Sequence, residues 1–309
     1  MNSKIIFTLS LIGIQFLMNF ANAQPKSLPV KFEELTAPEL VQAVERSEKT
    51  CIIPMGILEM HGAHLPLGTD LLDVREVVLR AVKTEYAVVF PPYYFGKIFE
   101  GMHQPGAIAY SPELIWKILE ETCDELGRNG FTKIVLVNGH GGNNDFINYF
   151  VNAQMSKKRN YAVILYTRLT VLDNLDTEAI KKINALRKTT LGGGHADEIE
   201  TSMIFAHRPD LVHLDMAKTE SGVDLKRLDY LVNGYGDTGI RWFSEYPNQY
   251  AGDGSVANKE IGDLALNSLA NNLADLLKII KKDKTVLELQ DEFYKKAENP
   301  IQTKPKENK

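Results

Sequence analysis

The chain has 309 residues, a formal net charge of −5 and 44% hydrophobic residues, which is enough apolar material for one large α/β domain or two smaller ones. Acidic and basic residues are interspersed and form no basic stripe, so the usual electrostatic signature of nucleic-acid binding is excluded. We therefore expect a globular protein without a nucleic-acid partner.

Residues 1–23 have the pattern of a secretory signal peptide. A positively charged start precedes a mostly apolar run over residues 5–20, and Ala21-Asn22-Ala23 has the small-x-small form of a cleavage site. The apolar run is interrupted by polar residues and is shorter than the roughly 20 residues that a membrane span needs. We expect cleavage after Ala23, export to the periplasm or the exterior, and no membrane span in the mature chain.

The rest of the chain alternates between short apolar runs, which predict buried strands, and amphipathic runs, which predict helices. In chain order the predicted elements are a helix over 32–45, a strand over 51–58, a helix over 71–84, a strand over 86–91, a helix over 111–129, a strand over 134–137, a helix over 143–157, a strand over 162–166, and helices over 176–190, 197–207 and 258–281. This alternation predicts a three-layer α/β/α fold with a mostly parallel sheet.

Three further features complete the expected organisation. Residues 209–253 show no pattern that places an element, and the charged residues 283–309 predict a helical surface appendage followed by a disordered tail. We expect residues 24–282 to form a single domain. Cys51 and Cys123 both fall in buried elements and are interpreted as small core residues, although export would also permit a disulfide between them.

Residues with metal-ligand chemistry follow two of the predicted strands. Glu59 and His61 are two positions apart, so their side chains leave the same face of an extended backbone, and Asp70 follows at a predicted helix start. His140 follows the strand over 134–137. The carboxyl ends of parallel strands share one edge of the sheet, where open α/β sheets bind ligands. Each residue alone is better explained as a polar strand end or helix cap, but together they indicate a divalent-metal site.

Three motifs occur in the order found in one known family. They are Leu58-Glu59-Met60-His61-Gly62 with Thr69-Asp70 downstream, Asn138-Gly139-His140-Gly141-Gly142-Asn143, and His195-Ala196-Asp197-Glu198-Ile199-Glu200-Thr201-Ser202. In this order they resemble the creatininase family of metal-dependent amidohydrolases, over residues 35–272. The resemblance implies a creatininase-like fold, two divalent ions (zinc, manganese or iron), a small-molecule substrate and a homo-oligomer, in this family a hexamer.

The resemblance also implies metal ligands. Asp70 would bridge the two ions, with Glu59 and His140 on one ion and His61 on the other. Creatininase itself supplies a further glutamate from the position of Gly142, which has no side chain here. We therefore expect Glu198 to act as the substitute ligand. The alternative is that Glu198 is a first-turn acid that complements the dipole of its helix.

The expected catalytic residues are His195 and, as a metal ligand, Glu198. An imidazole exchanges protons near neutral pH, so His195 is the candidate general acid for the leaving nitrogen; a metal ligand or a loop-packing residue are the alternatives. Substrate contacts are expected from the backbone amides of Gly141 and Gly142, which precede a helix, and from His103 in the long loop over 93–110. We expect Glu200 to support the site without touching substrate.

These features predict hydrolysis of a non-peptide C–N bond, in a cyclic amide or a formamide, by a metal-activated water. Gly141 stands where creatininase has an aromatic residue, and the family's Trp-Asp pair before the His-Gly-Gly motif is missing. Both departures argue against creatinine as the substrate. Two alternatives stay open, a metal-dependent sugar or lactone hydrolase or isomerase, and a non-catalytic exported protein that binds a metal or ligand.

Overall fold

The computed structural model describes residues 28–166 and 175–304, and within these residues the centre is a four-stranded sheet in the order β2-β1-β3-β4. The strands are β1 (Thr50–Met55), β2 (Val88–Val89), β3 (Lys133–Asn138) and β4 (Ala162–Tyr166). Every pairing is parallel, and the register places Ile134 between Cys51 and Val163. All residues of β1 and β3 are buried, as their continuous apolar runs predict for strands covered on both faces.

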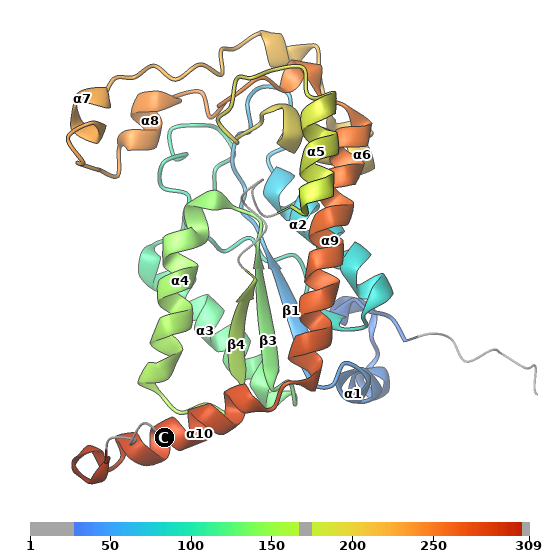
Figure 1. Cartoon of the computed structure of the whole chain (residues 1–309), viewed down its shortest axis with the longest axis vertical. Coiled ribbons are helices and arrows are strands. Elements are labelled where there is room, and N and C mark those ends of the chain that lie inside the picture. Colours follow the sequence, from blue (N-terminus) through green and yellow to red (C-terminus); the bar gives the residue numbers. More distant parts are fainter. Residues whose placement is uncertain (1–27, 167–174, 305–309) are drawn as a thin grey trace, which may run out of the picture.

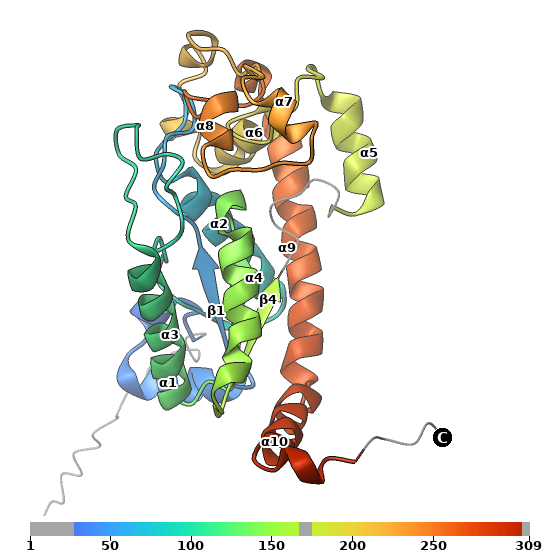
Figure 2. The same cartoon turned by 90° about the vertical axis from the view of Figure 1, so that its left-hand side faces the viewer.

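Helices cover both faces of the sheet, which confirms the predicted α/β class (Figures 1 and 2). Alternate strand residues face opposite sides, so Ile52 and Val135 join a core with α2 (Thr69–Thr84) and α9 (Lys259–Lys282). Ile53 and Leu136 join a second core with the opposite layer. That layer is formed by α1 (Ala37–Arg46), α3 (Pro112–Arg128) and α4 (Asn144–Ala153).

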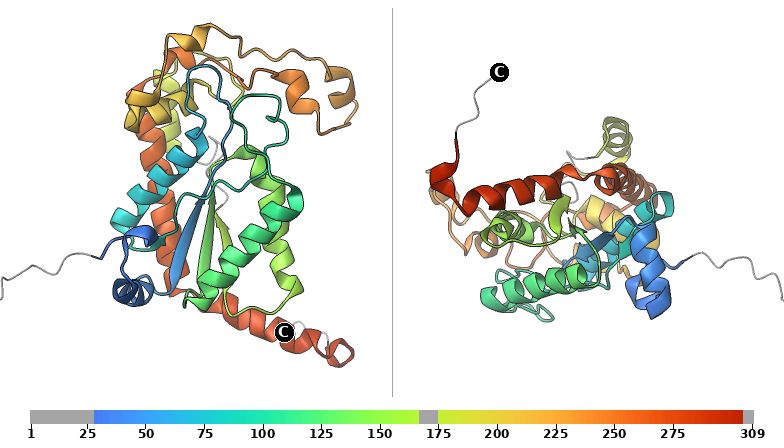
Figure 3. Two further views of the ribbon diagram at one scale, coloured as in Figure 1. Left: turned by 180° about the vertical axis from the view of Figure 1, so that it is seen from behind. Right: turned by 90° about the horizontal axis from the view of Figure 1, so that it is seen from below.

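The remaining helices lie at the two ends of the sheet. Beyond the carboxyl ends of the strands lie α5 (Thr177–Leu186), α6 (Glu198–His207), α7 (Asp229–Val232) and α8 (Arg241–Glu245), the last two within the region where the sequence placed no element (Figure 1). At the other end, α10 (Thr285–Ala297) turns away from α9 and has no fully buried residue, as expected for a surface appendage (Figure 3).

The proposed signal peptide and the last residues of the tail lie outside the described residues. No helix of the described chain is long and apolar enough to cross a membrane. Cys51 and Cys123 are both free and buried, in agreement with their interpretation as core residues. The strand expected over 51–58 ends at Met55, because residues 56–68 leave the sheet as the loop that carries Glu59 and His61.

The crossing of α6 over α9 depends on a close backbone contact. A Cβ atom added to Gly262 of α9 would lie only 1.9 Å from the carbonyl oxygen of Ser202 on α6. Ser202 Oγ in turn accepts a hydrogen bond from the backbone N–H of Asn258, at the start of α9, at 2.8 Å. The absence of a side chain at residue 262 therefore lets α6 pack closely against α9.

We predict that Gly262→Ala lowers the free energy of unfolding by about 1–3 kcal/mol or more, because a backbone carbonyl cannot move aside for the methyl group as a flexible side chain could. Gly239→Ala is the matched control, since a Cβ there would have no heavy atom within 4 Å. Denaturant titration of both variants checks this. Equal stability of the two variants would contradict the close packing of α6 on α9.

Candidate metal centre

Four of the predicted ligands meet at the carboxyl edge of the sheet. Glu59 and His61 come from the loop after β1, Asp70 lies in the first turn of α2, and His140 follows β3. All four are buried, with at most 6% of any residue exposed. Buried charged groups are costly unless they have charged or metal partners, so this cluster needs a positive counterpart.

The carboxylate of Asp70 lies between two imidazoles. Its Oδ1 atom is 3.2 Å from His61 Nε2, and its Oδ2 atom is 3.0 Å from His140 Nδ1. Glu59 Oε1 also lies 3.0 Å from His140 Nδ1. A carboxylate that turns one oxygen to each of two separate ligand groups has the arrangement of a bridging ligand.

The donor set fits divalent cations. Glu59 Oε1 and Asp70 Oδ2 are both buried, and both lie 3.0 Å from the same Nδ1 atom of His140. An imidazole nitrogen carries at most one hydrogen, so His140 cannot satisfy both oxygens, although buried polar atoms are nearly always satisfied. Burial by itself lowers the pKa of His61, but the carboxylates of Glu200, Asp70 and Glu59 outweigh it and raise that pKa to about 10. The same concentration of negative charge would favour a metal cation.

Glu200 replaces Glu198 as the acid of this cluster. Glu200 Oε1 lies 3.8 Å from His61 Nε2, and His61, Asp70 and Glu200 form a group whose ligand atoms all lie within 4.8 Å of one another. A second such group is Glu59, Asp70 and His140. The structure thus offers two overlapping three-residue groups that share Asp70.

The expectation that Glu198 is a metal ligand, and with it a catalytic residue, needs correction. Its carboxylate accepts hydrogen bonds from the backbone N–H groups of Lys188 and Thr189, at 2.8 and 3.3 Å, and lies 3.5 Å from Arg187 Nε. Residues two apart on an α-helix point roughly 200° apart, so Glu198 and Glu200 cannot share a target. Helical periodicity after the Asp197 cap could have identified Glu200, which was expected only to support the site.

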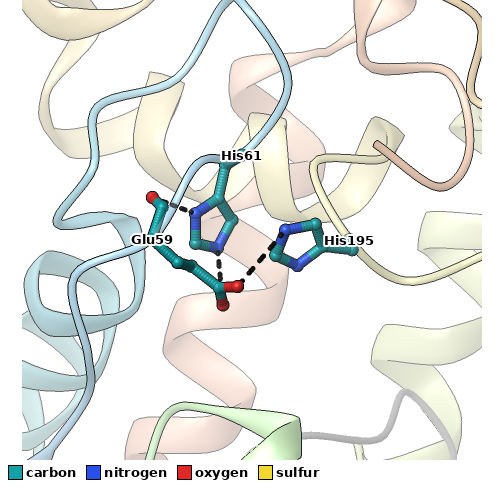
Figure 4. Close-up of side chains that lie close together, drawn as sticks. All are labelled: Glu59, His61 and His195. Carbon is teal, nitrogen blue, oxygen red and sulfur yellow. Dashed lines mark hydrogen bonds and ion pairs between the residues drawn. The ribbon is translucent and has the colours of Figure 1, made fainter. Parts of the chain in front are cut away.

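His195 lies against this cluster. Its ring stacks on His61 with 4.2 Å between centroids, and its Nε2 atom lies 3.0 Å from Met60 O and 3.9 Å from Glu59 Oε2. Figure 4 shows the Glu59 carboxylate reaching toward both imidazoles. Burial and the neighbouring charge of His61 lower the pKa of His195. Glu59, His61 and His195 also form a third group of close ligand atoms, so geometry permits either a ligand or a proton-transfer role.

A cavity of about 640 Å³ opens onto the cluster. Gly141 and Gly142 line it, as predicted, but His103 does not. His103 Nε2 instead lies 2.6 Å from the carbonyl oxygen of Pro247, and its ring packs against Phe243. Expecting a substrate contact from His103 was therefore wrong for this arrangement.

The sequence did not identify two residues of the cavity wall, Glu100 and Trp242. The indole of Trp242 meets the ring of His195 edge-on, at 5.6 Å between centroids. Trp242 lies in the region whose elements could not be placed from sequence. Glu100 lies in the long loop over 93–110, where only the length and composition of the loop signalled function.

Comparison with known proteins agrees with this arrangement. The family described as creatinine amidohydrolase matches residues 33–277. The chain is 30% identical over 193 residues to creatinine amidohydrolase from Pseudomonas putida, covering 59% of this chain and 73% of that protein. It is 25% identical over 276 residues to 3-dehydro-scyllo-inosose hydrolase from Thermotoga maritima, covering 81% and 83% respectively.

Solved structures share the fold. A crystal structure of creatininase superposes with a TM-score of 0.68 at 23% identity, covering 82% of this chain and 99% of that one. A manganese form of creatininase gives a TM-score of 0.66, also at 23% identity and with the same coverage. The match over residues 33–277, together with the three motifs and their meeting at one edge of a parallel sheet, shows that the chain belongs to the creatininase family of hydrolases.

Proposed function

We propose that this hydrolase is a two-metal enzyme that cleaves a non-peptide C–N bond, in a cyclic amide or a formamide. The observation that carries the proposal is the position of Asp70, which turns one buried oxygen to His61 and the other to His140. Glu59 and His140 would complete one ion site, and His61 and Glu200 the other. Zinc, manganese and iron all suit this mixed nitrogen and oxygen set.

When bound, a pair of divalent ions supplies Lewis acidity toward a carbonyl and an acidified water. The chain supplies position and proton transfer around that chemistry. Gly141 and Gly142 line the cavity without a side chain, and Trp242 and His195 also belong to its wall. The His195 side chain is held by its hydrogen bond to Met60 O, and its imidazole would give a proton to the departing nitrogen.

A sugar-derived substrate is the second candidate. The relative from Thermotoga maritima is a 3-dehydro-scyllo-inosose hydrolase and aligns with most of this chain, whereas another relative, from Mycolicibacterium smegmatis, is a mycofactocin precursor peptide peptidase. Screening the metal-loaded protein against formamides, lactams, lactones and cyclic polyol ketones would decide between the classes. A ring-opened product heavier than its substrate by one water, or release of formate from a formamide, supports hydrolysis, and a product of unchanged mass would overturn it in favour of isomerisation.

We further propose that the enzyme is exported and assembles as a homo-oligomer. Export is supported by the basic, apolar and small-residue pattern of residues 1–23, and assembly, as a hexamer, by the family resemblance. Mature protein from its natural host is expected to begin at Gln24 and to lie outside the cytoplasm. N-terminal sequencing that finds residues 1–23 still attached would contradict export with cleavage.

Metal content should distinguish the two neighbouring glutamates of α6. Glu200→Gln weakens a ligand of the site that includes His61, so we predict about one ion per chain in place of about two. Glu198→Gln should keep both ions and lower stability instead, because Glu198 is buried beside Arg187 and accepts two backbone hydrogen bonds. Elemental analysis of folded protein checks both variants. Loss of metal in Glu198→Gln alone would restore Glu198 as the ligand.

Substitution of His195 should separate proton transfer from metal binding. If His195 protonates the leaving nitrogen, His195→Ala keeps its metals and loses about 10²–10⁴-fold in turnover on an amide. The loss should shrink on the matched ester, because an alkoxide leaves with less need of a proton. Metal content and rates on the amide–ester pair measure this. Lost metal would assign His195 as a ligand, and equal losses on both substrates would exclude the leaving-group acid.

A further inference from the structure

Glu100 lines the cavity and carries a buried carboxylate oxygen that has no hydrogen-bond partner in the described chain. Its Oε1 atom accepts a hydrogen bond from Lys97 Nζ at 2.6 Å, while Oε2 is buried and has no hydrogen-bond partner in the described parts of the chain. Glu100 lines the same cavity as the metal cluster. A buried carboxylate oxygen without a hydrogen bond carries an uncompensated desolvation free energy. A donor from outside the described protein would lower this cost.

Gly142 makes room for this carboxylate. A Cβ atom at residue 142 would lie 2.8 Å from Glu100 Oε1 and 2.5 Å from His140 Nε2. Any side chain at this position would therefore collide with both groups. The acid of Glu100 and the glycine at 142 are structurally matched, and Glu100 occupies the part of the wall where a side chain from residue 142 would point.

The loop that carries Glu100 is fixed to the metal centre. The backbone N–H of Lys97 donates to Asn143 Oδ1 at 2.8 Å, and the carbonyl oxygen of Lys97 lies 3.1 Å from His140 Nε2. The carbonyl oxygen of Glu100 itself accepts from Gln249 Nε2 at 3.0 Å. Glu100 is thus held in place relative to His140 on one side and to the 241–249 segment on the other.

Glu100 is not placed to join the ligands. The two ring nitrogens of His140 face different groups, Nδ1 toward Glu59 and Asp70 and Nε2 toward the loop that carries Glu100. The imidazole ring therefore separates the Glu100 carboxylate from the carboxylates of the cluster. The candidate metal groups of the described chain do not include Glu100.

We propose that Glu100 is a specificity-determining residue whose carboxylate accepts a hydrogen bond from an N–H or O–H group of the substrate. Lys97 already balances its charge, so the donor can be neutral, such as a primary amide, a ureido N–H or a polyol hydroxyl. This inference rests on the proposed function, since it assumes that substrate binds at the neighbouring metals. It selects substrates that carry a donor remote from the bond to be cleaved.

The test uses binding of metal-chelating hydroxamates to the zinc-loaded full chain, measured by calorimetry. One series carries a terminal primary amide, separated from the hydroxamate by one to three methylenes, and the matched series carries a methyl ester in its place. The ester keeps the carbonyl and lacks the donor. In Glu100→Gln, Lys97 holds the amide oxygen and the –NH₂ group faces the ligand, so an acceptor becomes a donor without a change of shape.

We expect Glu100→Gln to weaken binding of the best primary-amide hydroxamate by about ten- to a hundredfold, the range expected for loss of a hydrogen bond to a charged group. The affinity of the matched ester, which lacks the donor, should change by less than about twofold. Metal content and melting temperature should match the wild type. Glu113→Gln, an exposed acid on α3, is the control and should change neither series.

The possible failures are distinguishable. If both series bind the wild type and Glu100→Gln weakens them equally, or not at all, the role of Glu100 is wrong while the proposed metal site stands. If Glu100→Gln loses metal, Glu100 is a ligand and the inference is overturned. If no hydroxamate binds the wild type and elemental analysis finds no metal, the proposed function fails and this inference fails with it.

Discussion

The structure depends on the burial of several ionisable groups at one edge of the sheet. Glu59 and Asp70 face His61 and His140 where little water reaches them, and Glu200, whose side chain is partly exposed, lies beside them. Removing so many charges from water costs free energy, which only charged partners in good geometry can offset. In this centre the imidazoles partly balance the carboxylates, but Glu59 Oε1 and Asp70 Oδ2 share the Nδ1 atom of His140, which can donate to only one of them. The arrangement is therefore suited to a cation, and the surrounding fold must hold it together.

Residues around the cluster hold its side chains in place through hydrogen bonds. Asp197 caps α6 by accepting from the backbone N–H groups of Ile199 and Glu200, which fixes the helix that carries Glu200. Thr201 Oγ1 donates to Ala196 O and lies 3.0 Å from His64 Nε2. Burial lowers the pKa of His64 to about 4, so this imidazole is neutral near pH 7 and adds no charge beside the metal centre. Positioning at this centre thus depends on the Asp197 cap and on hydrogen bonds around a neutral imidazole.

The sequence predicted the site residues that its motifs contain, and it missed wall residues that lie outside those motifs. Glu59 and His140 follow apolar runs, and the shared edge of parallel strands brings them together without further information. Glu198 was mistaken for a ligand because a motif gives the spacing of residues but not the face of the helix on which each one lies. The actual geometry follows from the Asp197 cap, which starts α6 and sets its rotation. Glu100 and Trp242 could not be predicted, since no periodicity describes the loop that carries Glu100, and the helix that carries Trp242 is only five residues long.

The candidate metal ligands and the outer wall of the cavity lie on different segments. The candidate ligands lie in the loop after β1, directly after β3, and in the first turns of α2 and α6. The outer wall includes the loop that carries Glu100 and the segment that carries Trp242 of α8, and the two are joined through one buried residue. Gln249 accepts from Trp242 Nε1 at 2.6 Å and donates to Glu100 O at 3.0 Å. Gln249 thus couples the position of Glu100 to that of Trp242 without touching the metal cluster. The relatives named for creatinine, an inosose derivative and a precursor peptide have different substrates, and a wall built separately from the cluster is a physical route to such differences.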